Sequence, residues 1–137
     1  MAKGLDILEY SGDGYKRAVE YGSWTVAFLR SCPEFEKNTY MEAHLLTDEV
    51  FILLGGGATL YIGKEREPVV MKPCRLYNVR AGTFHSIEVT PDAQVLICEN
   101  RDTCRGNTEY ITLEKYGLFH SRGRTVERTA LFYYMFS

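Results

Sequence analysis

Four side chains that can bind a metal ion lie in two short segments of the chain. Glu42, His44 and Glu49 lie in the first segment, and His85 lies in the second. Imidazole and carboxylate groups are suitable ligands for Fe(II), Mn, Ni and Zn, and three or four protein ligands leave positions open for substrate or water. The residue types therefore predict one divalent metal ion, of unspecified identity, bound by Glu42, His44, Glu49 and His85.

Each of these segments reads as a β-strand that ends at a turn. Glu42 and His44 are two residues apart, so they project from the same face of an extended strand. A tight turn at residues 47–48 would bring Glu49 back beside His44 from a neighbouring strand. His85 would then come from a third strand, which follows a bend.

Each candidate ligand also has a structural alternative. A lone histidine in a strand is more often a hydrogen-bonded structural residue, but a cluster of histidines with Glu49 favours ligation. Glu49 shares a strand face with Phe51 and Leu53, and an inward carboxylate needs a partner such as a metal ion. Glu42 is either a ligand or a hydrogen-bond acceptor that orients one.

Two further side chains are candidates for substrate contact. Tyr40 shares a strand face with Glu42 and His44, so we expect it to line the pocket. We expect Phe51, on the face of Glu49, to contact the substrate as well. The sequence identifies no catalytic residue. There is no Ser-His-Asp order and no nucleophile elbow, so hydrolysis by a serine mechanism is unsupported.

The two segments resemble the two motifs of the cupin superfamily, G-x5-H-x-H-x3or4-E-x6-G and G-x5-P-x-G-x2-H-x3-N. His44, Glu49 and Gly56 match the second His, the Glu and the closing Gly of the first motif. Gly82 and His85 match the Gly and the His of the second. The resemblance covers about residues 37–100.

The sequence departs from both cupin motifs at several positions. Glu42 stands in place of the first His, Cys74 in place of the opening Gly of the second motif, Arg80 in place of its Pro and Val89 in place of its Asn. The resemblance implies an all-β fold, the antiparallel double-stranded β-helix or jelly-roll barrel (RmlC-like), with a metal ion inside it.

The pattern of turns and apolar residues independently predicts an all-β domain. Short segments rich in Val, Ile, Tyr and Phe alternate with turn residues, which is typical of a sandwich or barrel. The predicted strands are 23–30, 39–46, 49–54, 58–62, 68–71, 75–79, 84–90, 94–99 and 108–113. Gly55–Gly57 stands between two of them and predicts a hairpin turn. Beyond these, residues 116–124 read as a loop that contains His120, and residues 129–136 as an aromatic strand or short helix.

Length and composition narrow the class of protein. A chain of 137 residues is long enough to bury a core, so we expect one domain over residues 1–137. The net charge of −2 gives no reason to expect nucleic acid or an acidic membrane as a partner. Neither a membrane-spanning apolar run nor a signal-peptide pattern is present, which predicts a cytoplasmic location.

The cysteines and the C-terminal segment lead to two further expectations. The four cysteines form no C-x2-C pair, so we expect free thiols, with Cys98 as the best candidate for a buried one. The segment Ala130–Phe136 is too apolar to be left in water. It should cover the barrel or pair with another subunit, and we predict a homodimer.

These features predict a metal-binding protein with a small polar organic molecule as its ligand. Metal-dependent oxygenase, isomerase and lyase chemistry all fit. The alternative is a non-catalytic module that binds or senses a small ligand, because one fold hosts many functions. A metal-free sugar epimerase fits less well, since that chemistry needs a His-Asp base and an acidic Tyr, whereas the carboxylates of this chain cluster with histidine.

Overall fold

The computed structural model describes residues 2–113 of the chain, and strands make up most of this part. The strands are β1 (Tyr15–Tyr21), β2 (Trp24–Arg30), β3 (Tyr40–His44), β4 (Glu49–Gly55), β5 (Ala58–Ile62), β6 (Glu67–Val70), β7 (Tyr77–Val79), β8 (His85–Val89), β9 (Gln94–Asn100) and β10 (Thr108–Thr112). Two one-turn helices complete it, α1 (Pro33–Glu36) and the 3-10 helix η1 (Arg105–Asn107).

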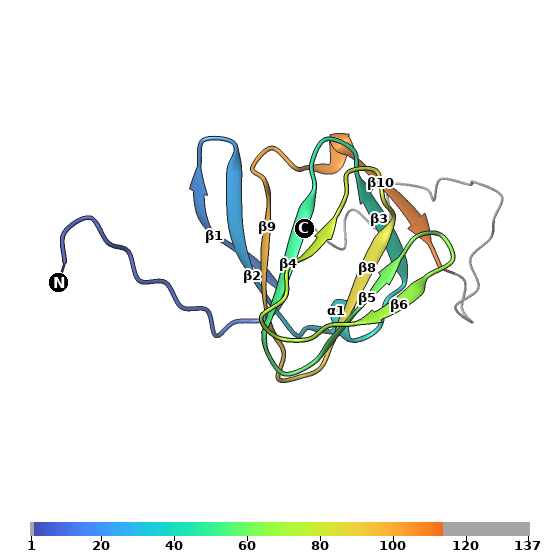
Figure 1. Ribbon diagram of the computed structural model, residues 1–137, viewed down its shortest axis with the longest axis horizontal. Helices are drawn as coiled ribbons and strands as arrows, with labels where there is room; N and C mark the ends of the chain where they lie inside the picture. The colour runs from blue at the N-terminus through green and yellow to red at the C-terminus, as the bar shows by residue number, and fades with distance from the viewer. Residues whose placement is uncertain (1, 114–137) are drawn as a thin grey trace.

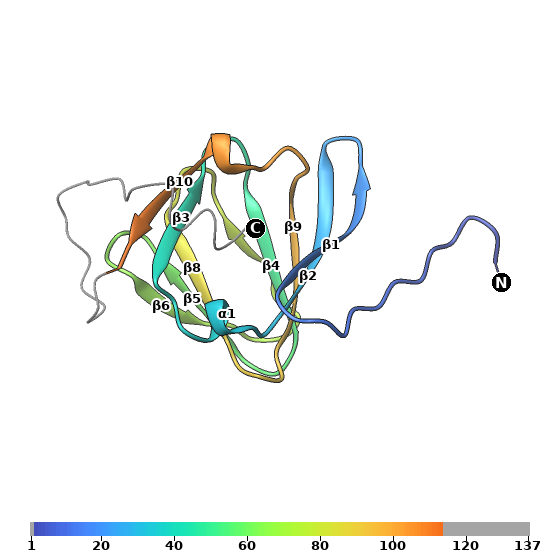
Figure 2. The same cartoon turned by 180° about the vertical axis from the view of Figure 1, so that it is seen from behind.

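The strands form two five-stranded sheets, ordered β1-β2-β9-β4-β7 and β10-β3-β8-β5-β6. Every pairing between neighbouring strands is antiparallel. The two sheets face each other around a common interior (Figures 1 and 2). The predicted all-β antiparallel jelly roll is confirmed.

All nine strands predicted in the described part are present, but strand β1 was not predicted. Its residues, YKRAVEY, show no apolar alternation, and most of them are exposed on both faces of the strand. β1 lies at the edge of its sheet, where only one neighbour is available and little apolar surface is buried. The two helices were also missed, since one turn is too short to show a helical period.

The inward faces of β4 and β9 change from apolar to polar along their length. Three pairs of residues lie opposite each other in register, and in order along the strands they are Leu53 with Val95, Phe51 with Ile97, and Glu49 with Glu99. The first two pairs belong to the main hydrophobic core. The third pair places two carboxylates at the end of that core, so one end of the interior is a packed core and the other is a polar site.

Two turns connect different sheets, which corrects two predictions. Gly55–Gly57 was predicted to be a hairpin turn, but it links β4 of one sheet to β5 of the other. Gly56 has a φ of 65°, and a Cβ there would lie 2.6 Å from the Cα of Ala93, so this crossing requires glycine. The turn at residues 47–48 likewise crosses between sheets, so Glu49 comes from the opposite sheet and not from a strand beside β3.

The crossing turn between β3 and β4 is held by hydrogen bonds. The carboxylate of Asp48 accepts one from the backbone N–H of Ala81 at 2.9 Å and one from Nδ2 of Asn78 at 3.1 Å. These bonds lower the pKa of Asp48 below its ordinary value. The hydroxyl oxygen of Thr47 accepts a third from the backbone N–H of Asn100 at 3.0 Å. The start of β4, and with it Glu49, is therefore fixed relative to β7 and β9.

The four cysteines are free, as predicted, but Cys98 is only partly buried. It alternates with inward-facing Ile97 and Glu99, so its side chain lies on the outer face of β9. The prediction that it is the buried cysteine is wrong. Among the described residues, neither helix is long and apolar enough to span a membrane. The predicted loop at 116–124, His120, the predicted element at 129–136 and the apolar segment Ala130–Phe136 lie outside the described residues.

Candidate metal and ligand site

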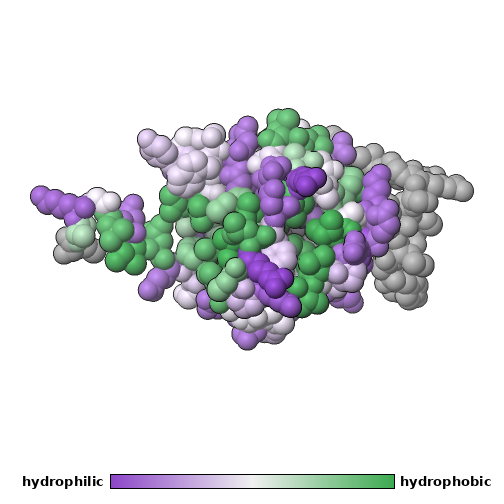
Figure 3. Space-filling model, viewed as in Figure 1, coloured by the Kyte–Doolittle hydropathy of each residue, from purple (hydrophilic) through white to green (hydrophobic). Residues whose placement is uncertain are grey.

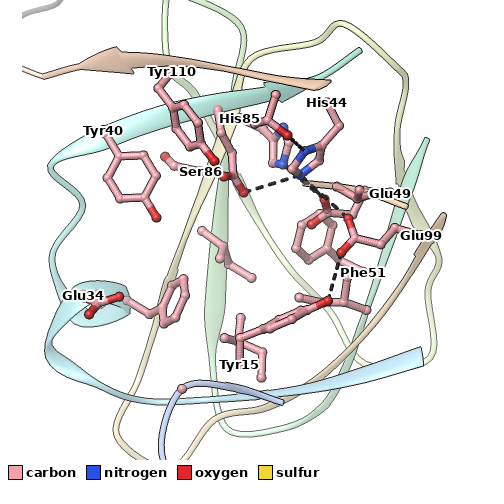
Figure 4. Close-up of a pocket in the computed structure, with 18 of the residues that line it drawn as sticks. Tyr15, Glu34, Tyr40, His44, Glu49, Phe51, His85, Ser86, Glu99 and Tyr110 are labelled. Atoms are coloured by element: carbon pink, nitrogen blue, oxygen red, sulfur yellow. Dashed lines mark hydrogen bonds and ion pairs between the residues drawn. The ribbon is translucent and has the colours of Figure 1, made fainter. Parts of the chain in front are cut away.

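Strands of both sheets bring the predicted site residues together. β3 contributes Glu42 and His44, β8 contributes His85, and β4 contributes Glu49 from the opposite sheet. Glu42 and His85 are direct partners in the register of β3 with β8. One ligand atom from each of the four side chains can be chosen so that all of them lie within 4.8 Å of one another. Figure 4 shows His44, His85 and Glu49 converging at one end of the pocket.

The closest approaches within this cluster involve Nε2 of His44. This atom lies 2.5 Å from Oε2 of Glu49 and 3.5 Å from Oε1 of Glu42. Nε2 of His85 lies 3.8 Å from the same Glu49 oxygen. The residues His44, Glu49 and His85 are only 8%, 5% and 2% exposed, so water screens these contacts little.

Hydrogen bonds from outside the cluster fix the tautomer of each imidazole in its neutral form. Nδ1 of His85 contacts the carbonyl oxygen of Thr83 at 3.0 Å, and because a carbonyl only accepts, Nδ1 must carry the proton. The hydroxyl of Thr108 donates to the carbonyl of Cys104 at 2.8 Å. Its oxygen therefore accepts from Nδ1 of His44, which lies 2.9 Å away. In the neutral rings, each Nε2 atom carries a lone pair that is directed into the cluster.

Several buried polar atoms in the interior lack a hydrogen-bond partner. Among them are Nε2 of His85, Oε2 of Glu49 and Oε2 of Glu99. Buried polar groups are normally satisfied, and unpaired ones cost about 1–3 kcal/mol each. The lone pairs of His44 and Glu49 also face each other at 2.5 Å. Two lone pairs at that distance repel unless a proton or a metal ion lies between them.

The charges in the site shift the pKa values of its members in opposite directions. Burial alone would lower the pKa of His44, but the carboxylates of Glu42 and Glu49 outweigh it and raise the value to about 11. Burial raises the pKa of Glu49 to about 8, and the nearby Glu99 carboxylate adds to the effect. Burial would also raise the pKa of Glu42, but contact with His44 lowers it. Burial lowers the pKa of His85. The metal-free cluster therefore retains protons at neutral pH.

A cavity of about 980 Å³ opens beside the cluster. Tyr40 and Phe51, both predicted to contact substrate, line it together with Tyr110. The rings of Tyr40 and Tyr110 lie 6.1 Å apart, and the ring of Phe51 lies 5.9 Å from that of His85. Aromatic walls with a few polar groups are typical of small-molecule sites.

Glu99 is a site residue that the sequence interpretation missed. It lies on β9, its side chain is 6% exposed, and its Oε2 is 3.8 Å from Nε2 of His44. Tyr15 of β1 donates a hydrogen bond of 2.9 Å to its other oxygen. The signal was available in the sequence, because Glu99 continues the inward alternation of Val95 and Ile97. It is the same signal that identified Glu49.

Solved structures resemble this fold at low sequence identity. No protein-family model and no curated protein sequence matches the chain. A cupin-2 domain protein from Shewanella frigidimarina aligns with a TM-score of 0.54 at 16% identity, over 67% of this chain and 85% of that one. KdgF from Halomonas sp. gives 0.51 at 16% identity, over 64% and 79%. A variant of Streptomyces Pac13 with uridine gives 0.58 at 10% identity, over 87% and 86%. A further structure describes Pac13 as a nucleoside dehydratase. Structural similarity at sequence identities this low shows a shared fold and nothing more.

Proposed function

We propose that this chain, which has the cupin fold, binds one divalent metal ion and acts on a small polar organic molecule in the adjoining cavity. His44, Glu49 and His85 would hold the ion, with Glu42 as a fourth ligand or as a residue that orients one. The observation that carries the proposal is the convergence of Nε2 of His44 and Nε2 of His85 on one buried oxygen of Glu49, at 2.5 and 3.8 Å. A divalent cation satisfies all three at once.

The donor set fits Fe(II), Mn, Ni or Zn. It combines imidazole nitrogens with carboxylate oxygens, and it lacks the thiolates that softer metals prefer. When bound, the ion would supply Lewis-acid or oxygen-activating chemistry to a coordinated substrate oxygen. The protein's own contribution is orientation: Thr108 and the carbonyl of Thr83 hold the imidazoles in the ligating tautomer. The rings of Tyr40 and Phe51 would exclude water from one side of the substrate.

Among the predicted reaction classes, isomerase or lyase chemistry is supported better than oxygenation. Both classes move protons, and the cavity holds a buried carboxylate outside the proposed ligand set, Glu99, that can accept or return them. The similarity to Pac13, a nucleoside dehydratase, supports the lyase class in particular. We therefore propose that the chain catalyses elimination or isomerisation of a small polar compound.

Metal titration tests the proposal directly. We expect purified protein, stripped with a chelator and reconstituted with Co(II) or Mn(II), to bind about one ion per chain. Glu49→Ala and His85→Ala should abolish that binding, whereas Glu109→Ala should not, because Glu109 does not line the cavity. If the reconstituted parent binds no ion, the metal proposal is wrong. His44 would then be an imidazolium in contact with Glu42 and Glu49, as in a metal-free acid–base site.

We also propose that the chain forms a homodimer, now with support from its N-terminal end. Residues 2–9 form no strand or helix and extend away from the two sheets (Figure 1). Leu5, Ile7 and Leu8 on this arm are 57%, 73% and 46% exposed. Hydrophobic side chains gather along the arm in Figure 3. An exposed apolar arm of this kind fits reciprocal exchange with a second copy, in which each arm covers the other subunit.

A further inference from the structure

The two carboxylate oxygens of Glu99 have different surroundings. Oε1 accepts a hydrogen bond of 2.9 Å from the hydroxyl of Tyr15, while the buried Oε2 has no partner. Oε2 lies 3.8 Å from Nε2 of His44, so it faces the cluster. Figure 4 places Glu99 between Tyr15 and the cluster.

The β1 strand prevents Glu99 from turning elsewhere. Nε of Arg17 donates to the hydroxyl oxygen of Tyr15 at 3.3 Å. The rest of the Arg17 guanidinium donates to the carbonyls of Arg101 at 2.9 Å and Thr103 at 3.1 Å. The guanidinium thus ties the first hairpin, β1–β2, to the loop after β9. The hydroxyl of Tyr15, which donates to Glu99, is fixed in position by its own contact with Arg17.

A carboxylate oxygen that is buried, fixed and unpartnered needs a hydrogen-bond donor from outside the protein. The nearby imidazole cannot supply it once the ion is bound, because Nδ1 of His44 donates to Thr108 and Nε2 would then face the metal with its lone pair. With the ion bound, Glu42 and Glu49 are carboxylates and can only accept hydrogen bonds. With the ion bound, the described residues offer Oε2 no donor, and the molecule that occupies the cavity beside the ion can supply one.

We propose that Glu99, positioned by Tyr15 and Arg17, is a ligand-binding residue that selects molecules with a hydroxyl group next to the oxygen that they place on the metal. Hydroxy acids, hydroxy ketones and sugars carry this pair of groups. The inference rests on the proposed metal site and names the class of ligand for it. A hydrogen bond to a charged acceptor contributes about 1.5–3 kcal/mol, which corresponds to roughly 10- to 100-fold in affinity.

A matched pair of probes isolates this hydrogen bond. Glycolate and methoxyacetate both offer a carboxylate and an adjacent oxygen to a metal ion, but only glycolate has a hydroxyl proton to donate. Each would be titrated into the Co(II)-loaded protein and followed by the visible absorption of the ion. We expect the parent to bind glycolate roughly 10- to 100-fold more tightly.

Glu99→Gln should remove the preference for glycolate while Co(II) affinity stays close to that of the parent. Tyr15 would keep the carbonyl of the new amide, so the amide N–H groups would face the hydroxyl donor. Tyr15→Phe should reduce the preference in part, and Glu109→Gln should leave it unchanged.

The inference is wrong if the parent does not prefer glycolate, or if Glu99→Gln prefers it as strongly as the parent. It is also wrong if Glu99→Gln loses Co(II) together with the preference, because Glu99 would then be a metal ligand. Failure of the parent to bind Co(II) is a separate result: it refutes the proposed metal site, and the ligand class inferred from that site with it.

Discussion

Metal binding at neutral pH should release about two protons from the protein. In the metal-free site, His44 has a pKa of about 11 and Glu49 a pKa of about 8. Both groups therefore hold a proton at pH 7. A metal ligand must be deprotonated, so an ion that binds through His44 and Glu49 displaces both protons.

The size of the effect follows from these values. Below pH 8, two displaced protons make the metal affinity rise about 100-fold per pH unit. Between pH 8 and 11 only the proton of His44 remains to be displaced, so the rise should fall to about 10-fold per unit. His85 contributes little at pH 7, because burial lowers its pKa and keeps the ring neutral.

Calorimetry in two buffers of different ionisation enthalpy counts the released protons, and an indicator dye in weak buffer gives an independent count. We expect about two protons per ion for the parent at pH 7, and for Glu109→Gln as a control. Glu49→Gln, if it retains weak binding, should release one fewer. Release of no protons, with affinity independent of pH from 6 to 8, would refute the assignment of protons to His44 and Glu49.

Three further predictions concern the ligands, the fold and the assembly. Glu42→Ala should weaken metal binding roughly 10- to 100-fold and His85→Ala should abolish it; equal affinity for parent and Glu42→Ala in equilibrium dialysis would make Glu42 a bystander. Gly56→Ala should lower the free energy of unfolding by on the order of 2–4 kcal/mol in urea titrations, since it combines a positive φ with a backbone clash. Gly82→Ala, where φ is also positive but space is open, should cost only about 1–2 kcal/mol. Removal of residues 1–9 should convert the dimer to a monomer in sedimentation equilibrium, and a parent that is already monomeric at high concentration would contradict the homodimer.

The strand faces were predictable because alternation in a β-strand is a local property. Tyr40, Glu42 and His44 had to share a face once residues 39–46 were read as a strand. The structure places all three along the cavity. The same reasoning put Glu49 and Phe51 on one face, and both line the cavity as well. The alternation of side chains along single strands was enough to predict most of the site residues.

The route of the chain between sheets was not predictable in the same way. A tight turn at residues 47–48 can join two strands of one sheet or cross to another, and turn residues do not distinguish these outcomes. The choice depends on which strands pair, which is set by packing of the whole interior. Tyr15 and Arg17 were missed for a related reason: β1 buries little, so its sequence lacks the apolar pattern of a core strand.

The buried carboxyl groups of the site lower the stability of the fold. This loss supports the assignment of the cluster as the functional site. Glu49 and Glu99 are direct register partners, and two carboxylates placed opposite each other destabilise a sheet when both are ionised. A folded-state pKa of about 8 for Glu49, above its ordinary 4.5, means that stability from this group falls as pH rises from 4.5 to 8. His44 acts in the same direction: its raised pKa stabilises the fold below pH 6.5, and that contribution is lost as pH rises toward 11.

A bound cation reverses both penalties at once. It neutralises the carboxylates and replaces the protons that they would otherwise need. At a free concentration 100 times its dissociation constant, an ion stabilises the fold by about 2.7 kcal/mol. The metal-free protein should therefore lose stability between pH 5 and 8, and the metal-loaded protein should lose much less over the same interval. Thermal unfolding with and without chelator measures the difference. Parallel pH profiles for the two forms would show that the charge of this cluster is balanced by something other than a metal ion.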